Sequence, residues 1–155
     1  MEEATAISKG QPESREWEDE LRRYMVRYQA GDGPSVEELV HRLSSSLFSY
    51  FMTPQLSLSD VEDLVQECWL RIHRSRQTYR ATEPLLPWIF AIARHTLLEA
   101  LVEEMRQGDS ETQLYAGLLA RKLLVGDEEM MRVFGKEVAE MLGIVAEYQR
   151  KRQAA

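Results

Sequence analysis

The sequence is poor in cysteine and holds only Cys68 in 155 residues. A single cysteine can form neither an internal disulfide nor a cysteine-rich metal site. Because disulfides belong to oxidising compartments, their absence favours a reducing one. We therefore expect a cytoplasmic protein.

Long apolar runs are also missing, since no stretch approaches the roughly 20 apolar residues that a membrane span needs. The first residues include Glu2 and Glu3 rather than the basic and then apolar profile of a signal peptide. We expect no membrane partner.

Signs of catalytic or cofactor chemistry are equally scarce. The three histidines, His41, His73 and His95, fall in separate predicted helices without metal-ligand spacing. No glycine-rich phosphate loop and no nucleophile motif is present. The sequence thus predicts no enzyme, no metal site and no cofactor.

The charges are unevenly distributed along the chain. The net charge of −7 argues against nucleic-acid binding, because phosphate contacts come from Lys and Arg. Residues 68–98, however, hold only Glu83 as an acid, whereas residues 1–20 and 99–111 are rich in acids. The basic side chains of that middle segment are Arg71, Arg74, Arg76, Arg80 and Arg94, with His73 and His95. A basic centre between acidic flanks is compatible with a local nucleic-acid site.

Apolar residues recur at helical spacing, and alternating strand patterns are absent, so we predict an all-α protein. We expect a disordered arm over 1–16, a helical domain over 17–107 and a C-terminal helical segment over 108–155. The predicted helices are 17–28, 35–52, 59–76, 84–106, one opening at Ser110, and 127–142 with Gly143 as its stop. Two capping boxes are predicted, Ser35 with Glu38 and Ser59 with Glu62.

The predicted helix 59–76 has two distinct faces. One face is apolar and should be buried: Val61, Leu64, Val65, Cys68 and Ile72. The other is acidic and amide-bearing around an apolar centre: Asp60, Asp63, Gln66, Glu67 and Leu70. This outward face is either an ordinary solvated surface or a docking surface for a basic helix.

The string DVEDLVQECWLRI at residues 60–72 resembles the second conserved helix of region 2 in bacterial sigma factors. The resemblance implies that this helix docks on the clamp helices of the largest RNA polymerase subunit. By motif position, Asp63, Gln66 and Glu67 would make the polar contacts, with Leu70 beside them and Asp60 at the edge.

The segment YRATEPLLPWIFAIARH at residues 79–95 resembles the next part of the same region in small sigma factors of the extracytoplasmic-function (ECF) type. The resemblance covers residues 19–106 in order and implies contact with the promoter −10 element as single-stranded DNA. The candidate DNA-binding residues are Arg76, Arg80, Thr82, Trp88, Arg94 and His95. The alternative is that Trp88 is a core aromatic and that the arginines only solubilise the surface.

Two departures from the family pattern stand out. The first lies at the end of the matched segment, where residues 97–106 carry acids in place of the family's cations and His95 replaces a frequent Asn. In the same stretch Leu98 and Val102 form an apolar stripe, which we expect to be exposed and suited to another helix. The second departure lies further along the chain. Residues 136–144 resemble the first helix of the −35-reading region 4, but no recognition helix follows. Region 4 is thus interpreted as degenerate or truncated, with 108–155 a candidate remnant.

Three hypotheses remain open. The first is an ECF-like sigma factor that binds core polymerase and a −10 promoter element, with an anti-sigma factor as a candidate regulator. The second is a sigma-fold mimic that occupies an anti-sigma factor or polymerase without sequence-specific DNA binding. The third is a helical oligomerisation module that uses Leu98, Val102 and the helices over 114–142.

Overall fold

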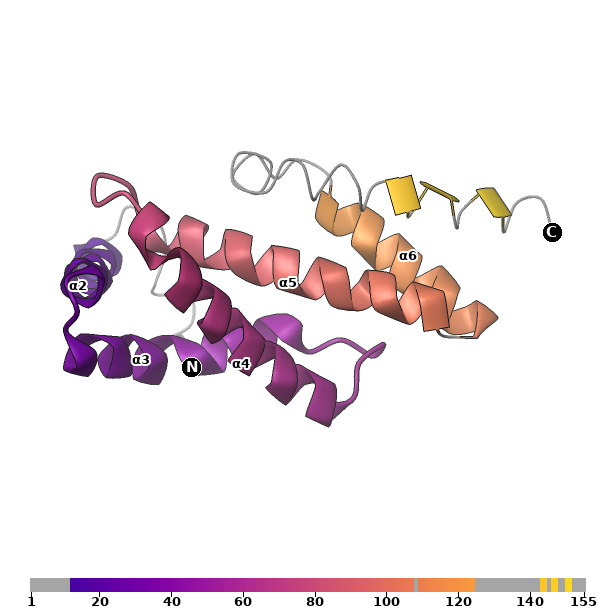
Figure 1. Ribbon diagram of the computed structural model, residues 1–155, viewed down its shortest axis with the longest axis horizontal. Helices are drawn as coiled ribbons and strands as arrows, with labels where there is room; N and C mark the ends of the chain where they lie inside the picture. The colour runs from indigo at the N-terminus through magenta and orange to yellow at the C-terminus, as the bar shows by residue number, and fades with distance from the viewer. Residues whose placement is uncertain (1–11, 108, 125–142, 145, 148–149, 152–155) are drawn as a thin grey trace.

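The computed structural model describes residues 12–107, 109–124, 143–144, 146–147 and 150–151, and over these residues the chain is helical and contains no strand. The all-α prediction is confirmed. The elements are α2 (Pro12–Gln29), α3 (Gly33–Phe51), α4 (Leu58–Ser75), the 3₁₀ turn η1 (Arg76–Thr78), α5 (Leu85–Gln107) and α6 (Ser110–Leu124), as drawn in Figure 1. The predicted helix 127–142 lies outside the described residues.

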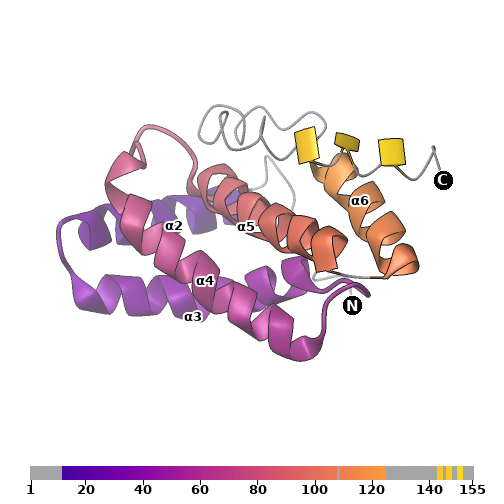
Figure 2. The ribbon, with the colours of Figure 1, turned by 45° about the vertical axis from the view of Figure 1, so that its right-hand side comes forward.

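Helix α5 is the centre of the bundle. Helices α2 and α4 pack against it, α6 packs along its C-terminal half, and α3 joins α2 to α4 on the far side (Figures 1 and 2). Its buried residues lie all around its circumference rather than on one stripe: Leu85, Trp88, Ile89, Ala91, Ile92, Ala93, His95, Thr96, Leu97, Leu98, Leu101, Val102 and Met105. A helix that is apolar all round is stable in water only when it is covered on several sides.

The N-terminal ends of the helices differ from the prediction. Asp32 caps α3 by accepting a hydrogen bond from the Ser35 backbone N–H at 3.2 Å, so the predicted Ser35 cap is wrong. Pro34 suits the first turn, because its missing N–H needs no partner there. Gly31 has a φ of 99°, which allows the tight connection from α2.

Helix α4 begins at Leu58, one residue before the predicted start, and its N-cap is Ser57 rather than the predicted Ser59. Its capping box joins Ser57 to Asp60, with the Asp60 N–H 3.1 Å from Ser57 Oγ and the Ser57 N–H 3.3 Å from the Asp60 carboxylate. The sequence offers two overlapping S-x-x-acid patterns, and the predicted Ser59 pattern is the wrong one.

Helix α2 begins at Pro12, five residues before the predicted helix start at residue 17. Pro12 is compatible with a first helical turn, because its missing N–H needs no partner there. Residues 1–11 lie outside the described part of the chain.

The apolar stripe on α5 is buried, which corrects the prediction that it is exposed. Leu98 is 0% exposed and Val102 is 3% exposed. The cover includes α6, whose small residues allow close approach: a Cβ added at Gly117 would lie 3.3 Å from Met105 Cε. Leu98 and Val102 are therefore not free to form the interface of an oligomerisation module, and the part of that predicted interface over residues 125–142 lies outside the described residues.

By length and composition alone, α5 passes as a membrane-spanning helix, with a mean hydropathy of 1.4 over its most apolar window. However, 67% of that window is buried inside the bundle. The core helix of a bundle has the same property, so this is weak evidence for a membrane span.

The α5–α6 packing can be tested by truncating a buried and an exposed leucine. We expect Leu98→Ala to lower the free energy of unfolding by about 2–5 kcal/mol, because it leaves a cavity in a closed interface. Leu118→Ala is the matched control on α6, where the side chain is 52% exposed, and it should cost less than about 0.5 kcal/mol. Urea denaturation followed by circular dichroism measures both, and equal effects would contradict the burial of Leu98.

Candidate functional site

Four of the five predicted docking residues form one exposed face of α4. Asp60, Asp63, Gln66 and Leu70 are exposed, with Leu70 at 50%. Positions 63, 66, 67 and 70 follow the i, i+3, i+4, i+7 spacing that aligns side chains along a helix. We call residues 60, 63, 66, 67 and 70 the α4 face.

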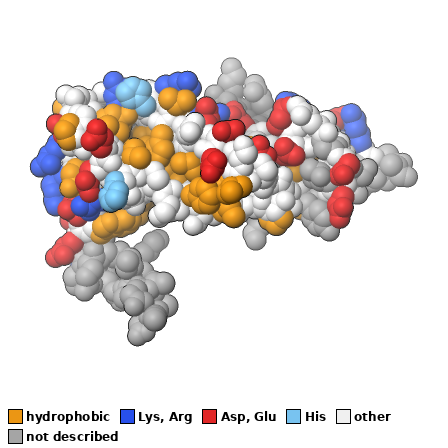
Figure 3. Space-filling view, turned by 90° about the horizontal axis from the view of Figure 1, so that it is seen from below, with side chains coloured by type: hydrophobic (Ala, Val, Ile, Leu, Met, Phe, Trp, Pro, Cys, Tyr) orange, Lys and Arg blue, Asp and Glu red, His pale blue; other side chains and the backbone are white. Residues whose placement is uncertain are grey.

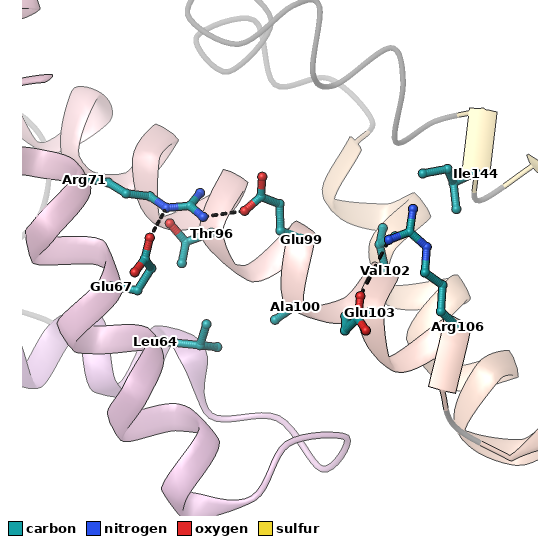
Figure 4. Close-up of a pocket in the computed structure, with 10 residues that line it drawn as sticks. All are labelled: Leu64, Glu67, Arg71, Thr96, Glu99, Ala100, Val102, Glu103, Arg106 and Ile144. Atoms are coloured by element: carbon teal, nitrogen blue, oxygen red, sulfur yellow. Dashed lines mark hydrogen bonds and ion pairs between the residues drawn. The ribbon is translucent and has the colours of Figure 1, made fainter. Parts of the chain in front are cut away.

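The fifth residue, Glu67, is tied to a central arginine. Arg71 Nε donates to Glu67 at 2.9 Å, and the same guanidinium donates to Glu99 on α5 (Figure 4). Burial alone would lower the pKa of Arg71, but the hydrogen bonds that its guanidinium donates to Glu99 and Glu67 outweigh burial and raise that pKa. Arg71 therefore stays charged and fixes the Glu67 carboxylate at the edge of the α4 face.

The same guanidinium orients His95. Arg71 Nη1 lies 3.0 Å from His95 Nδ1, and a guanidinium can only donate, so Nδ1 accepts and the ring proton lies on Nε2. His95 Nε2 faces the Glu99 carboxylate at 3.8 Å. His95 is 5% exposed, which places it between α4 and α5.

The end of α4 is joined to α2 by a polar cluster. Gln29 Nε2 donates to the carbonyls of Arg76, at 2.7 Å, and Tyr79, at 2.9 Å, while Tyr28 Oη lies 2.6 Å from His73 Nδ1. The Arg76 guanidinium lies 5.9 Å from the centroid of the Tyr28 ring, within cation–π range. These contacts fix the direction in which the chain leaves η1.

The loop from Tyr79 to Pro84, which we call the α4–α5 loop, is stabilised by hydrogen bonds between its own residues. Tyr79 Oη donates to the Glu83 carbonyl at 2.5 Å, and the Glu83 N–H donates to the Arg80 carbonyl at 3.0 Å. Burial raises the pKa of Tyr79 to about 12, so its hydroxyl remains a donor. The Trp88 ring lies 5.5 Å from the Tyr79 ring and supports it.

The predicted DNA-binding residues are divided between surface and core. Arg80 and Thr82 are exposed on the α4–α5 loop, with Arg80 Nη1 3.8 Å from Glu83. Arg94 is half-buried. Trp88, at 3% exposed, and His95, at 5% exposed, present no open face, so their contact with DNA stays a prediction.

A basic cluster on α2 was missed by the sequence analysis. Arg22, Arg23 and Arg27 line an open cavity of about 430 Å³ together with Val26 and Ala81 of the α4–α5 loop. Figure 3 shows Lys and Arg side chains gathered at the end of the molecule where α2 lies. We call these three residues the α2 arginine cluster. The i, i+4 spacing of Arg23 and Arg27 was the available signal, but acids dominate the preceding residues.

Within the described residues, no group of three or more His, Cys, Asp or Glu side chains could hold a metal ion. The lone thiol, Cys68, is buried, and burial raises its pKa to about 12. The arrangement therefore offers surfaces for binding: an acidic face on α4 and a basic surface made by the α2 arginine cluster and the α4–α5 loop.

Comparison with known proteins identifies one family and two relatives. Residues 39–107 match the family model described as Sigma-70 region 2. The ECF RNA polymerase sigma factor SigF of Caulobacter vibrioides is 35% identical over 83 residues, which is 53% of this chain and 46% of the relative. The ECF RNA polymerase sigma-E factor of Haemophilus influenzae is 28% identical over 85 residues, which is 55% of this chain and 44% of the relative. The matched part thus spans about half the length of each relative.

The ion pairs of Arg71 can be tested against those of its neighbour Arg74. We expect Arg71→Met to lower the free energy of unfolding by about 1–3 kcal/mol, because it leaves Glu67 and Glu99 without their charged donor. Arg74 lies 4.0 Å from Glu67 and its side chain is 68% exposed, so Arg74→Met should cost less than about 1 kcal/mol. Thermal and urea unfolding of both variants measure the difference. Equal stability losses would show that Arg71 does not join α4 to α5.

Proposed function

We propose that the protein is an ECF-like sigma factor that binds core RNA polymerase and engages the promoter −10 element as a single strand. The match of residues 39–107 to the Sigma-70 region 2 model and the similarity to two ECF sigma factors support this proposal. The proposal includes a cytoplasmic location, no catalytic role, and an anti-sigma factor as a further partner. The observation that carries it is the exposed α4 face inside the matched region.

The α4 face supports polymerase docking by its charge and shape. Asp63 and Gln66 supply an acceptor and an amide at the surface, and Leu70 supplies an exposed apolar contact beside them. A basic partner helix, such as the clamp helices of the largest polymerase subunit, would pair with the acids and cover the leucine. Such complementarity sets orientation and association rate, and a buried apolar contact adds affinity.

The DNA side of the proposal rests on the α4–α5 loop and the arginines around it. Arg80 and Thr82 point outward from a loop that Tyr79 and Trp88 support from below. A melted strand needs cations along its phosphates and a fixed loop to hold an unstacked base. We therefore add the α2 arginine cluster to the predicted DNA-binding set, and we assign Trp88 a supporting role.

The acids after residue 98 argue less against DNA binding than their number suggests. Glu99 is paired with Arg71, and Glu103 with Arg106 at 3.6 Å. Both lie along the half of α5 that points away from the α2 end of the bundle (Figures 1 and 4). They therefore face neither the α4–α5 loop nor the α2 arginine cluster, so the sigma factor is favoured over a mimic.

Polymerase docking is tested with the double variant Asp63→Ala/Gln66→Ala. We expect it to abolish copurification with core polymerase while the circular dichroism spectrum and melting temperature remain unchanged, because both side chains are exposed. The matched control is Glu37→Ala/His41→Ala, a double substitution of exposed residues on α3. Undiminished binding by the α4 variant would refute the docking assignment.

Strand binding is tested by fluorescence anisotropy of polymerase-bound protein on a single-stranded −10 oligonucleotide. Removing two phosphate contacts with Arg23→Ala/Arg27→Ala should weaken binding and lower the slope of log affinity against log salt by about 1.4, because each contact on a single strand contributes about 0.7. An unchanged slope would exclude the α2 arginine cluster from the strand path.

Run-off transcription with core enzyme on a promoter library tests the complete activity. We expect transcripts that depend on the protein and are reduced by Arg80→Ala, since Arg80 is exposed on the loop. Binding to core polymerase without any transcript at low salt would contradict the sigma factor hypothesis and support the hypothesis of a sigma-fold mimic.

A further inference from the structure

An open groove of about 510 Å³ lies between α4 and α5 beside the α4 face (Figure 4). Residues three or four positions apart line it on both helices: Leu64, Glu67 and Arg71 on α4, and Thr96, Glu99, Ala100, Glu103 and Arg106 on α5. Val102 and Ile144 complete the lining. From Thr96 to Arg106 the groove follows α5 for about 15 Å, or about three helical turns. It is thus long enough to take a segment of a partner helix.

The floor of the groove is apolar. Leu64 on α4 points across it toward Ala100 on α5, and both side chains are half-buried (Figure 4). Covering apolar surface that water still reaches is favourable, because the covered area no longer has to be hydrated. The floor therefore suits an apolar side chain of a partner.

Carboxylates outnumber guanidinium groups on the walls of the groove. Glu99 and Glu103 stand on the α5 side, with side chains 43% and 49% exposed, and Glu67 stands on the α4 side. Arg71 and Arg106 pair with these acids, which leaves the lining with more negative than positive charge. Because a carboxylate has two oxygens and accepts several hydrogen bonds, the paired acids can still bind the cations of a partner.

The groove is continuous with the α4 face through Glu67, which belongs to that face and also lines the groove. Successive residues of a helix are rotated by about 100°, so Asp60 and Glu67 lie on the side of the α4 face nearest Leu64, and Gln66 lies on the far side. A helix that lies along the near side of the α4 face therefore also covers the groove. It then has acids of α4 on one side and acids of α5 on the other.

We propose that the docking surface for RNA polymerase extends from the α4 face across this groove to Glu99 and Glu103, so that a basic helix of the polymerase lies over the groove. This inference rests on the proposed function. The polymerase helix places an apolar side chain on Leu64 and Ala100 and directs its cations to the acids on both sides. Charge complementarity along two walls fixes the position of the partner helix. The acids after residue 98, which depart from the family pattern, thereby acquire a role in docking.

The α5 wall is tested with Glu99→Gln/Glu103→Gln in the full chain, by equilibrium titration with core polymerase. The dissociation constant should rise roughly 5- to 20-fold at low salt, and the difference from the parent should shrink as salt increases. The matched control is Glu37→Gln/Glu62→Gln, which changes the net charge equally at exposed positions on α3 and on the side of α4 that faces away from the groove. This control should bind as tightly as the parent.

A second variant separates binding from folding, since Glu99 also pairs with Arg71 between the helices. Glu103→Gln alone leaves that pair intact, because Glu103 pairs with Arg106 within α5. Its dissociation constant should rise roughly 2- to 5-fold while the melting temperature stays that of the parent. An unchanged dissociation constant in both the single and the double variant would overturn the part of α5 in docking.

The floor is tested with Ala100→Trp, which fills the groove without changing the net charge. We expect the dissociation constant for core polymerase to rise roughly 10-fold or more, because the apolar side chain of the partner loses its place. The matched control is Ser45→Trp, at an exposed position on α3, which should bind like the parent. Circular dichroism should report equal helix content in both proteins. Full binding by folded Ala100→Trp would overturn the docking of a partner side chain in the groove.

The outcomes separate this inference from the proposed function. Loss of polymerase binding by Asp63→Ala/Gln66→Ala, together with full binding by the Glu103 and Ala100 variants, would overturn the extended surface and leave the proposed function standing. Absence of polymerase binding by the parent would overturn both. A dimer in sedimentation that Ala100→Trp dissociates would also overturn the inference, in favour of a second copy of this chain in the groove.

Discussion

Helix α5 has no polar face over most of its length, and its sequence therefore demands neighbours on several sides. Helices α2, α4 and α6 pack against it, and Leu98 and Val102 in its second half are buried. Burial of this apolar surface is the largest favourable term available to a bundle of this size. The positions of the outer helices follow from it, and so do the surfaces that those helices leave exposed.

This packing places two surfaces of opposite charge on different sides of the helical bundle. Helix α4 turns Val61, Cys68 and Ile72 inward and thereby presents its acids to solvent. Helix α2 ends beside the α4–α5 loop, so its arginines meet the basic residues that follow α4. Arg71 stabilises the boundary, because its ion pairs hold α4 and α5 together where the acidic surface ends. A protein that docks on one partner while holding a charged strand needs such a division.

The α4 face could be predicted from the sequence because α4 has a single buried side. For such a helix a period of 3.6 residues separates inside from outside, and Asp63, Gln66 and Leu70 were placed correctly. The same reasoning does not work for α5, where Trp88 and His95, both candidates for DNA contact, are buried. Periodicity identifies a face only when one face is buried.

The sequence by itself determined the helical class, the approximate bounds of the helices and the outward residues of α4, because these depend on local spacing and on residue type. Only the tertiary structure decided which of two capping patterns begins α4, that Leu98 and Val102 are buried, and that the α2 arginine cluster lies beside Ala81. It also brought Ile144 to the groove beside the α4 face. Most of these features are contacts between residues far apart in the chain, and a local sequence pattern does not determine which distant helix packs against a given surface. The start of α4 is a choice between two local patterns of equal strength, which the sequence alone does not decide.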